Sequence, residues 1–202
     1  MISTPNDIRV DEYIEAYIPT VIIWILMLSI LALPKYSIIN ALFQTILILL
    51  WSYGGHVLAH KISSTGPLSY LNPHVFLHHD KKIKLSRTLE LCIEAIVNFF
   101  GFFIIFIIQK LFNYDIFSLS LLIGSAFLYI IIHILDYSMN ATIKHTLHHT
   151  IHYCNYEPEL FDTLFGTRCE PQKPYTNMFI EIPHAIFAFL LAGSIKIYFN
   201  LD

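Results

Sequence analysis

Four long apolar segments, arranged as two closely spaced pairs, dominate the pattern of hydrophobic and polar positions. They cover residues 17–33, 36–55, 91–109 and 116–136. A helix needs roughly 17 to 25 predominantly apolar residues to cross a bilayer, and only a few polar residues separate the two members of each pair. The pattern therefore predicts two helical hairpins that together span a membrane four times.

A fifth apolar segment, residues 178–199, contains Glu181, Pro183 and His184. Ionisable groups are costly inside a bilayer, and a proline removes a helical hydrogen bond. We therefore expect an interfacial or partly embedded helix here. A fifth span is the alternative, and it would change only the side of the membrane on which the C-terminus lies.

Two long polar stretches, residues 56–90 and 137–177, follow the hairpins. With the N-terminus they hold nine lysine and arginine residues, against Lys35 and Lys110 in the two short turns. Positively charged loops stay on the cytosolic side of a membrane. We expect an all-α integral membrane protein, with four transmembrane helices under a cytosolic, histidine-rich helical cap. It would form one domain over residues 1–202, in the endoplasmic reticulum of a eukaryote or the inner membrane of a bacterium.

The composition agrees with a membrane protein. Hydrophobic residues make up 55% of the chain and charged residues 13%, and the mean hydropathy is +0.59. A net charge of −3 argues against binding to nucleic acid, which needs an excess of lysine and arginine. The three cysteines, Cys92, Cys154 and Cys169, are odd in number and form no C-x-x-C pair, so we expect no disulfide framework and a reducing environment.

Eight of the 11 histidines fall into three tight groups within the two polar stretches. The first group, His56 and His60, follows the second apolar segment. Their i and i+4 spacing puts both side chains on one face if the helix continues past the membrane. Gly54 and Gly55, directly before them, are expected to allow a close approach of another backbone.

The second group opens a further helix. Asn72 can cap this helix, and Pro73 suits its first position. His74 and His78 would then lie together on one face, with His79 rotated slightly away from them.

The third group, His145, His148 and His149, has similar spacing and again follows a predicted span. Eight clustered histidines exceed the four ligands of a single structural zinc ion. Imidazoles packed this closely without a metal would repel one another on protonation. We therefore expect two metal ions.

His133 lies inside the fourth apolar segment, where an ionisable group is costly and usually functional. Asp136, almost one turn further on, could orient the imidazole through its second nitrogen, or could simply stabilise the helix end. Four other residues are expected at helix ends or surfaces rather than as metal ligands: Glu90, Glu94, His152 and His184.

The third histidine group is followed by Asn155-Tyr156 and by a segment from Asp162 to Thr167 that reads Asp-x-x-Phe-Gly-Thr. With the two earlier groups, these residues resemble the fatty acid hydroxylase and sterol desaturase superfamily of membrane di-iron enzymes. The resemblance covers about residues 45–170. It is specific, because three histidine boxes must occur in order between two pairs of spans.

The resemblance implies four transmembrane helices under a cytosolic cap and two iron ions held by histidines. Zinc could replace the iron on overexpression. The implied metal ligands are His56, His60, His74, His78, His79, His133, His145, His148 and His149, and no further catalytic residue is implied.

The chain departs from the family pattern in two places. The second box has three residues between its first histidine and its histidine pair, where close relatives often have two. Tyr137 stands where the fatty acid branch carries a second histidine on the fourth span, so the branch stays open. We expect Tyr137 not to bind metal, because a neutral phenol is a poor ligand.

The expected activity is the O2-dependent hydroxylation or desaturation of a C–H bond in a sterol, a fatty acyl chain or a related lipid. The reaction needs electrons, and the chain carries no haem, flavin or dinucleotide motif. A separate donor is therefore expected, such as cytochrome b5 or ferredoxin with its reductase. The alternatives are a membrane protein that binds or transports metal through its histidine clusters, and a relative that keeps the site without turnover.

Overall fold

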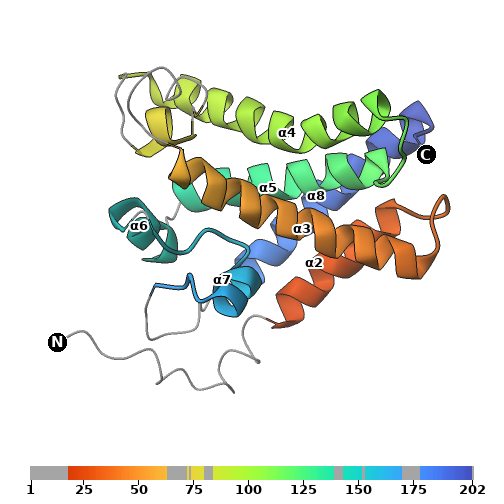
Figure 1. Cartoon of the computed structure of the whole chain (residues 1–202), viewed down its shortest axis with the longest axis horizontal. Coiled ribbons are helices and arrows are strands. Elements are labelled where there is room, and N and C mark those ends of the chain that lie inside the picture. The colour runs from red at the N-terminus through yellow and green to blue at the C-terminus, as the bar shows by residue number, and fades with distance from the viewer. Residues whose placement is uncertain are drawn as a thin grey trace.

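The protein is all-helical wherever the structure describes it. The computed structural model describes residues 18–62, 72, 74–79, 84–138, 143–151, 153–169 and 178–201, without the side chains of residues 18, 76–78, 135–138, 143–146 and 178–181. The body of the protein consists of long helices: α2 (Ile18–Leu31), α3 (Ile38–Lys61), α4 (Arg87–Leu111), α5 (Leu119–Ser138) and α8 (Met178–Phe199). Shorter helices lie beside it: the π-helix η2 (His74–His79), α6 (Ile143–Thr150) and α7 (Glu159–Phe165) (Figure 1).

Serine side chains fix the start of two of the long helices. Ser37 Oγ accepts a hydrogen bond from the Asn40 N–H, and Ser86 Oγ accepts one from the Leu89 N–H, each at 3.4 Å. Such caps satisfy backbone donors that no helical carbonyl can reach. These caps mark where the first turn ends and α3 begins, and where the first histidine-bearing stretch ends and α4 begins.

Helix α5 lies at the centre of the bundle and contacts α4, α8 and α2. Gly124 makes this close packing possible. A Cβ at this position would overlap Leu31 Cδ1 of α2 and would lie 3.5 Å from Ala192 Cβ of α8. Leu121 and Leu122 beside it are almost completely buried. Three helices therefore meet around a residue without a side chain.

The helices long and apolar enough to cross a membrane differ from the four expected spans. Among the residues whose side chains the structure describes, they are α3, α4 and the Ile182–Phe199 part of α8, whereas Pro19–Leu31 and Leu119–Ile134 are shorter apolar stretches of α2 and α5. The prediction of helices in all four segments is confirmed, and two of the four reach membrane length within these described residues. Helix α8 contacts α5 and α2 within the bundle, which favours the alternative that it is a further span.

The two short turns and the end of α8 meet at one end of the bundle. Lys35, after α2, pairs with Asp115, after α4, at 2.8 Å. Lys196 of α8 donates hydrogen bonds to the carbonyl oxygens of Leu31 and Leu33, both at 2.6 Å. The C-terminal end of α8 therefore lies beside the turns, and η2 and α6 lie at the opposite end (Figure 1).

Candidate metal centre

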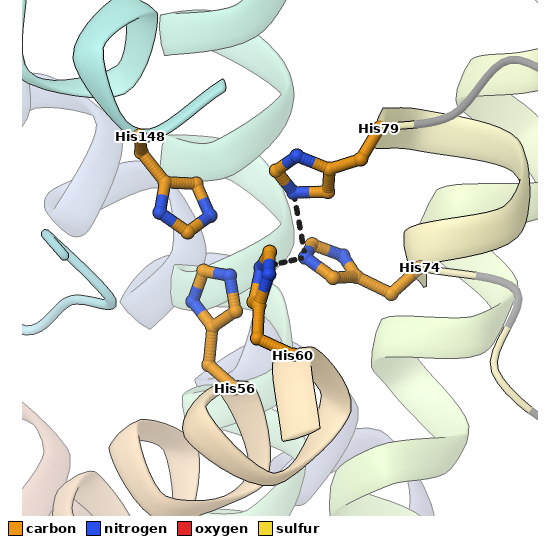
Figure 2. A group of neighbouring side chains, drawn as sticks. All are labelled: His56, His60, His74, His79 and His148. Carbon is orange, nitrogen blue, oxygen red and sulfur yellow. Dashed lines mark hydrogen bonds between the residues drawn. The ribbon is translucent and has the colours of Figure 1, made fainter. Parts of the chain in front are cut away.

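Five histidines converge at the end of the bundle that lies opposite the short turns. His56 and His60 come from α3, His74 and His79 from η2, and His148 from α6 (Figure 2). One nitrogen of each ring lies within 4.8 Å of those of the others. Imidazole is the commonest metal ligand in proteins. These five residues, the histidine cluster, could therefore hold a metal ion.

The separations between ring nitrogens match those of ligands on a metal ion. His74 Nε2 lies 3.3 Å from His60 Nε2 and 3.2 Å from His79 Nε2. With metal–nitrogen bonds of about 2.0–2.1 Å, neighbouring ligands of one ion lie about 3.0 to 3.4 Å apart, and opposite ones about 4.2 Å apart.

The π-helical form of η2 decides which histidines of the second group meet. Hydrogen bonds in a π-helix join residue i to residue i+5, so side chains five positions apart lie close together. The rings of His74 and His79 accordingly lie with their centroids 4.9 Å apart. The expected α-helix would have paired His74 with His78, whose side chain lies outside the described part of the structure.

Asn72 joins the two elements that carry the first four histidines of the cluster. As expected, it caps η2, because its Oδ1 accepts a hydrogen bond from the Val75 N–H at 3.5 Å. Its Nδ2 donates to the carbonyl oxygen of Ala59, in the last turn of α3, at 2.5 Å. The same side chain therefore starts η2 and holds it against the end of α3.

Backbone carbonyl groups orient two of the five rings. His56 Nδ1 donates to the Tyr156 carbonyl oxygen, and His148 Nδ1 donates to the Cys154 carbonyl oxygen at 2.6 Å. A carbonyl oxygen only accepts, so each ring carries a proton on Nδ1 and leaves Nε2 to bind a metal. His56 Nε2 is buried and has no hydrogen-bond partner among the described residues. A buried lone pair of this kind fits a metal ion.

The two carbonyl groups belong to a loop that Asp162 holds in place. Asp162 Oδ1 accepts hydrogen bonds from the Tyr156 N–H at 2.9 Å and the Thr167 hydroxyl at 2.7 Å, and its Oδ2 accepts from the Glu157 N–H at 2.8 Å. The Thr167 hydroxyl also bonds the Tyr53 hydroxyl of α3 at 2.8 Å. The Asn-Tyr and Asp-x-x-Phe-Gly-Thr motifs therefore form one hydrogen-bonded unit behind the histidine cluster. Both motifs were identified from the sequence by resemblance, but the hydrogen bonds that join them could not be predicted from it.

A disulfide bond joins Cys154 to Cys169 within this loop, with the Cα atoms 5.3 Å apart. The expectation of no disulfide is wrong for these two cysteines, and the reducing environment inferred from it loses its basis. The fold brings them together: Asn155 donates its N–H to the Thr167 carbonyl oxygen at 2.9 Å, and its Oδ1 accepts from the Cys169 N–H at 3.1 Å. Cysteine spacing alone could not reveal this loop closure. Cys92, on α4, is free and exposed.

Two further histidines lie against the cluster. The His149 ring stacks on that of His79, with centroids 4.4 Å apart. His133 of α5 is buried, stacks on Tyr129 at 5.6 Å, and lies 6.1 Å from His74 between ring centroids. Both are near the cluster, but neither belongs to the five whose nitrogens meet.

Several other expected residues fall outside the described part of the structure. The backbones of four of them lie in η2, α5 and α6, but their side chains are not described: His78, Asp136, Tyr137 and His145. His152 lies outside the described residues altogether.

The residues expected at helix ends divide into two kinds. Glu90 lies in the first turn of α4 and pairs with Arg87 at 3.2 Å, as expected of a charge at a helix N-terminus. Glu94 lies one turn further on and is only 5% exposed, so it is not a solvated surface charge.

At Gly54 and Gly55 an added Cβ would meet nothing within 4 Å. The expectation of a close backbone approach there is therefore wrong.

Tyr156 covers the cluster on the side of the loop. Its ring centroid lies 5.7 Å from that of His56, 5.5 Å from that of His60 and 5.7 Å from that of His148. Burial raises the pKa of the Tyr156 phenol above its ordinary value of 10.0. The phenol therefore stays neutral at ordinary pH.

A donor set made only of imidazoles suits a divalent transition metal such as iron, copper, nickel or zinc, rather than magnesium or calcium, which prefer oxygen. The histidine cluster lies at the end of α3, which is long and apolar enough to span a membrane. Searches of protein-family models, curated proteins and solved structures find no match to this chain.

Proposed function

We propose that the protein is an O2-dependent membrane oxidoreductase that hydroxylates or desaturates a lipid C–H bond at two iron ions. The observation that carries the proposal is the convergence of five imidazoles, from three separate elements, beside helices of membrane length. A structural zinc site is closed by four ligands, whereas here a cluster of five is flanked by His133 and His149. The resemblance of the histidine groups to membrane di-iron enzymes points to the same chemistry.

The residues of this chain would hold and orient the ions. The carbonyl groups of Tyr156 and Cys154 fix the rings of His56 and His148, so that Nε2 is the metal-binding atom of each. These two histidines are 6% and 1% exposed, which keeps bulk water away from this side of the centre. Bound iron would supply the redox chemistry that activates O2 against an unreactive C–H bond.

The setting in a membrane favours a lipid substrate such as a sterol or a fatty acyl chain. Hydroxylation and desaturation differ in how the substrate is placed relative to the ions, so the proposal includes both. The electrons would come from a separate protein, such as cytochrome b5 or ferredoxin with its reductase. The charge of the loops favours a site that faces the cytosol, whereas the Cys154–Cys169 disulfide is typical of an oxidising compartment.

A protein that binds or transports metal is the second candidate. His133 favours it, because this buried histidine of α5 lies 6.1 Å from His74 between ring centroids. Transporters, however, bind their ions near the middle of the membrane on broken helices, whereas the five clustered histidines lie at one end of the bundle. This candidate predicts flux of Fe(II) into vesicles without any change in lipid.

Iron content tests the metal half of the proposal. Protein prepared without oxygen and titrated with Fe(II) should bind about two ions per chain, because one ion cannot use all these ligands. His56→Ala and His148→Ala should each lose much of the iron. His184→Ala is the matched control, since His184 lies on α8 outside the cluster, and it should keep the iron. Saturation of the unaltered protein at one ion, or at none, contradicts the di-iron proposal.

Lipid analysis tests the reaction half. Cells that express the protein with an electron donor should accumulate a hydroxylated or desaturated lipid that is absent from cells with His56→Ala. An unchanged lipid profile, together with iron uptake by vesicles that contain the protein, would favour transport instead.

A further inference from the structure

The Cys154–Cys169 disulfide lies next to the histidine cluster. Cys154 makes two contacts at once: its sulfur is bonded to that of Cys169, and its carbonyl oxygen accepts the hydrogen bond from His148 Nδ1 at 2.6 Å. Along Cys154, only Cβ, Cα and the carbonyl carbon separate these two atoms. A change in the position of the sulfur is therefore passed on to the ring of a candidate metal ligand.

The disulfide also ties together the two sides of the loop that carries the orienting carbonyl groups. Asn155 lies between the two residues whose carbonyl oxygens fix the rings of His148 and His56. The Asn155 N–H donates to the Thr167 carbonyl oxygen at 2.9 Å, and its Oδ1 accepts from the Cys169 N–H at 3.1 Å. The segment that orients the two histidines is therefore held across the loop by the disulfide as well as by these hydrogen bonds.

The two sulfurs differ in how easily solvent reaches them. Cys154 is 2% exposed, whereas Cys169 is partly exposed. Thiol–disulfide exchange depends on access to the sulfur that is attacked. A thiolate from outside the protein therefore attacks Cys169, and the sulfur of Cys154 is the leaving group.

The charge of the histidine-bearing stretches favours a cytosolic position for this loop. Thiols are kept reduced in the cytosol, and the disulfides that occur there are usually transient and catalytic or redox-sensing. A disulfide within a loop that orients metal ligands, at a face that the charges assign to the cytosol, therefore indicates a bond that opens and closes.

We propose that Cys154 and Cys169 form a thiol–disulfide switch on the metal centre: the disulfide form binds metal tightly, and reduction by a dithiol protein weakens the binding. The inference rests on the metal centre of the proposed function and adds regulation of that same site. Opening the bond frees a chain segment with a sequence separation of 15 between its ends. The Cys154 carbonyl group then moves away from His148, whose ring loses its orientation.

The exchange balances in atoms and electrons. A thiolate of the dithiol protein bonds to the Cys169 sulfur, the bond between the two cysteines breaks, and Cys154 takes up a proton to become a thiol. The second thiol of the reductant then attacks the reductant's own sulfur in the mixed disulfide, and Cys169 leaves as a thiol. Two electrons and two protons pass to the cysteine pair, and the reductant is released with a disulfide of its own.

Metal affinity in the two redox forms tests the switch. Full-length protein, in detergent and without oxygen, is titrated with Co(II) either as the disulfide or after reduction by immobilised thioredoxin, which filtration then removes. Reduction should lower the Co(II) affinity roughly 10- to 100-fold, the usual effect of losing a group that orients a metal ligand, and reoxidation should restore it. Equal affinities of the two forms, or a disulfide that thioredoxin does not reduce, overturn the proposal.

A double variant separates loss of the bond from metal binding by the new thiols. Cys154→Ser with Cys169→Ser should bind Co(II) as weakly as the reduced protein, and thioredoxin should not change its affinity. Cys92→Ser, which replaces the free and exposed cysteine of α4, is the matched control and should respond to thioredoxin as the unaltered protein does. A double variant that binds as tightly as the disulfide form contradicts the proposal.

His148→Ala tests the route through the Cys154 carbonyl group. Reduction should weaken Co(II) binding less in His148→Ala than in His60→Ala, because only the latter keeps the ring that Cys154 orients. The two variants are matched, since each removes one ligand of the same cluster. An equal effect of reduction on both contradicts the coupling.

The redox state in cells decides between a switch and a permanent bond. Free thiols are alkylated in rapidly quenched cells, and the disulfides are then reduced and alkylated with a reagent of different mass. We expect the disulfide fraction of Cys154 and Cys169 to rise on treatment with the thiol oxidant diamide and to fall when it is removed. An unchanged fraction overturns the proposal.

Lipid conversion, measured separately, distinguishes the switch from the proposed function. A redox-dependent Co(II) affinity in a protein that converts no lipid would leave the switch assigned and reject the oxidoreductase. Iron binding and lipid conversion that are equal in the disulfide form and in the double serine variant would reject the switch alone.

Discussion

His56 donates its Nδ1 proton to the backbone carbonyl oxygen of Tyr156, which lies 100 positions further along the chain. This hydrogen bond joins the end of α3 to the loop before α7. Asp162 fixes the shape of that loop by accepting hydrogen bonds from two backbone N–H groups and one hydroxyl. The orientation of a candidate metal ligand therefore depends on a carboxylate that is not part of the histidine cluster. Asp162 is a positioning residue.

Asp162→Asn should weaken iron binding roughly 10- to 100-fold, the usual effect of losing a group that orients a metal ligand. Asparagine keeps one acceptor oxygen, and its NH2 group would face donors that the carboxylate now satisfies. Competition with a coloured Fe(II) chelator measures the affinity. The Co(II)-substituted protein should also show a shifted ligand-field spectrum, which a general loss of stability would not produce.

Asp115→Asn is the matched control, because Asp115 lies in the turn at the opposite end of the bundle. It should bind Fe(II) and Co(II) as the unaltered protein does. Unchanged affinity and spectrum in Asp162→Asn would show that the loop does not orient His56.

The sequence predicted the helical class and the grouping of the histidines because both depend on local periodicity. It did not predict the geometry of η2, since π-helical and α-helical turns have no distinct pattern of polar residues. It also could not predict the orienting groups, which are backbone carbonyls and carry no residue-specific signal. Their partners, His56 and Tyr156, meet only in the folded chain.

The assignment of α8 shows another limit of sequence patterns. Glu181, Pro183 and His184 suggested a helix at the membrane surface. All three lie near its N-terminal end, and Ile182–Phe199 still qualifies in length and hydropathy as a span. Whether α8 lies in the bundle depends on its packing against α5 around Gly124, and hydropathy does not encode that contact.

Gly124→Ala should destabilise the bundle by about 1–3 kcal/mol, the usual cost of adding a methyl group to a packed core. The added Cβ would overlap Leu31 Cδ1, and Leu31 is only 3% exposed, so it has little room to move. Gly193→Ala is the matched control on α8, because a Cβ there meets nothing within 4 Å. It should be neutral or stabilising, since alanine favours a helix over glycine. Thermal unfolding in detergent measures both, and equal melting temperatures would contradict the packing seen around α5.

The ion pairs of Asp115 should stabilise the turn end of the bundle in a pH-dependent way. Hydrogen bonds from Lys35 and then Lys110 lower the pKa of the Asp115 carboxyl below its ordinary value of 3.8. The folded state therefore favours the ionised form. The contribution is complete above the ordinary pKa and is lost as the pH falls through the lowered value.

Asp115→Asn should accordingly lower the melting temperature slightly near neutral pH, since an exposed ion pair contributes only about 0.2–1 kcal/mol. The difference from the unaltered protein should disappear at pH values well below 3.8. A difference that stays constant over this range would show that the carboxylate charge plays no part.

The two ends of the bundle should lie on opposite sides of the membrane. Lys196 donates hydrogen bonds to the carbonyl oxygens of Leu31, the last residue of α2, and Leu33 in the turn that follows, so the C-terminal end of α8 lies with the short turns. If α8 spans the membrane, Lys35→Cys and Asn200→Cys should react with an impermeant maleimide from the same side. Lys82→Cys, in the histidine-bearing stretch, should react from the opposite, cytosolic side.

The experiment uses a Cys92→Ser background, because Cys92 is the free exposed cysteine of the described residues, and permeabilised vesicles serve as the control for reactivity. Labelling of positions 82 and 200 from one side would show that α8 does not cross. Labelling of positions 35 and 82 from one side would overturn the hairpin topology, and with it the shared membrane face on which the histidine cluster depends.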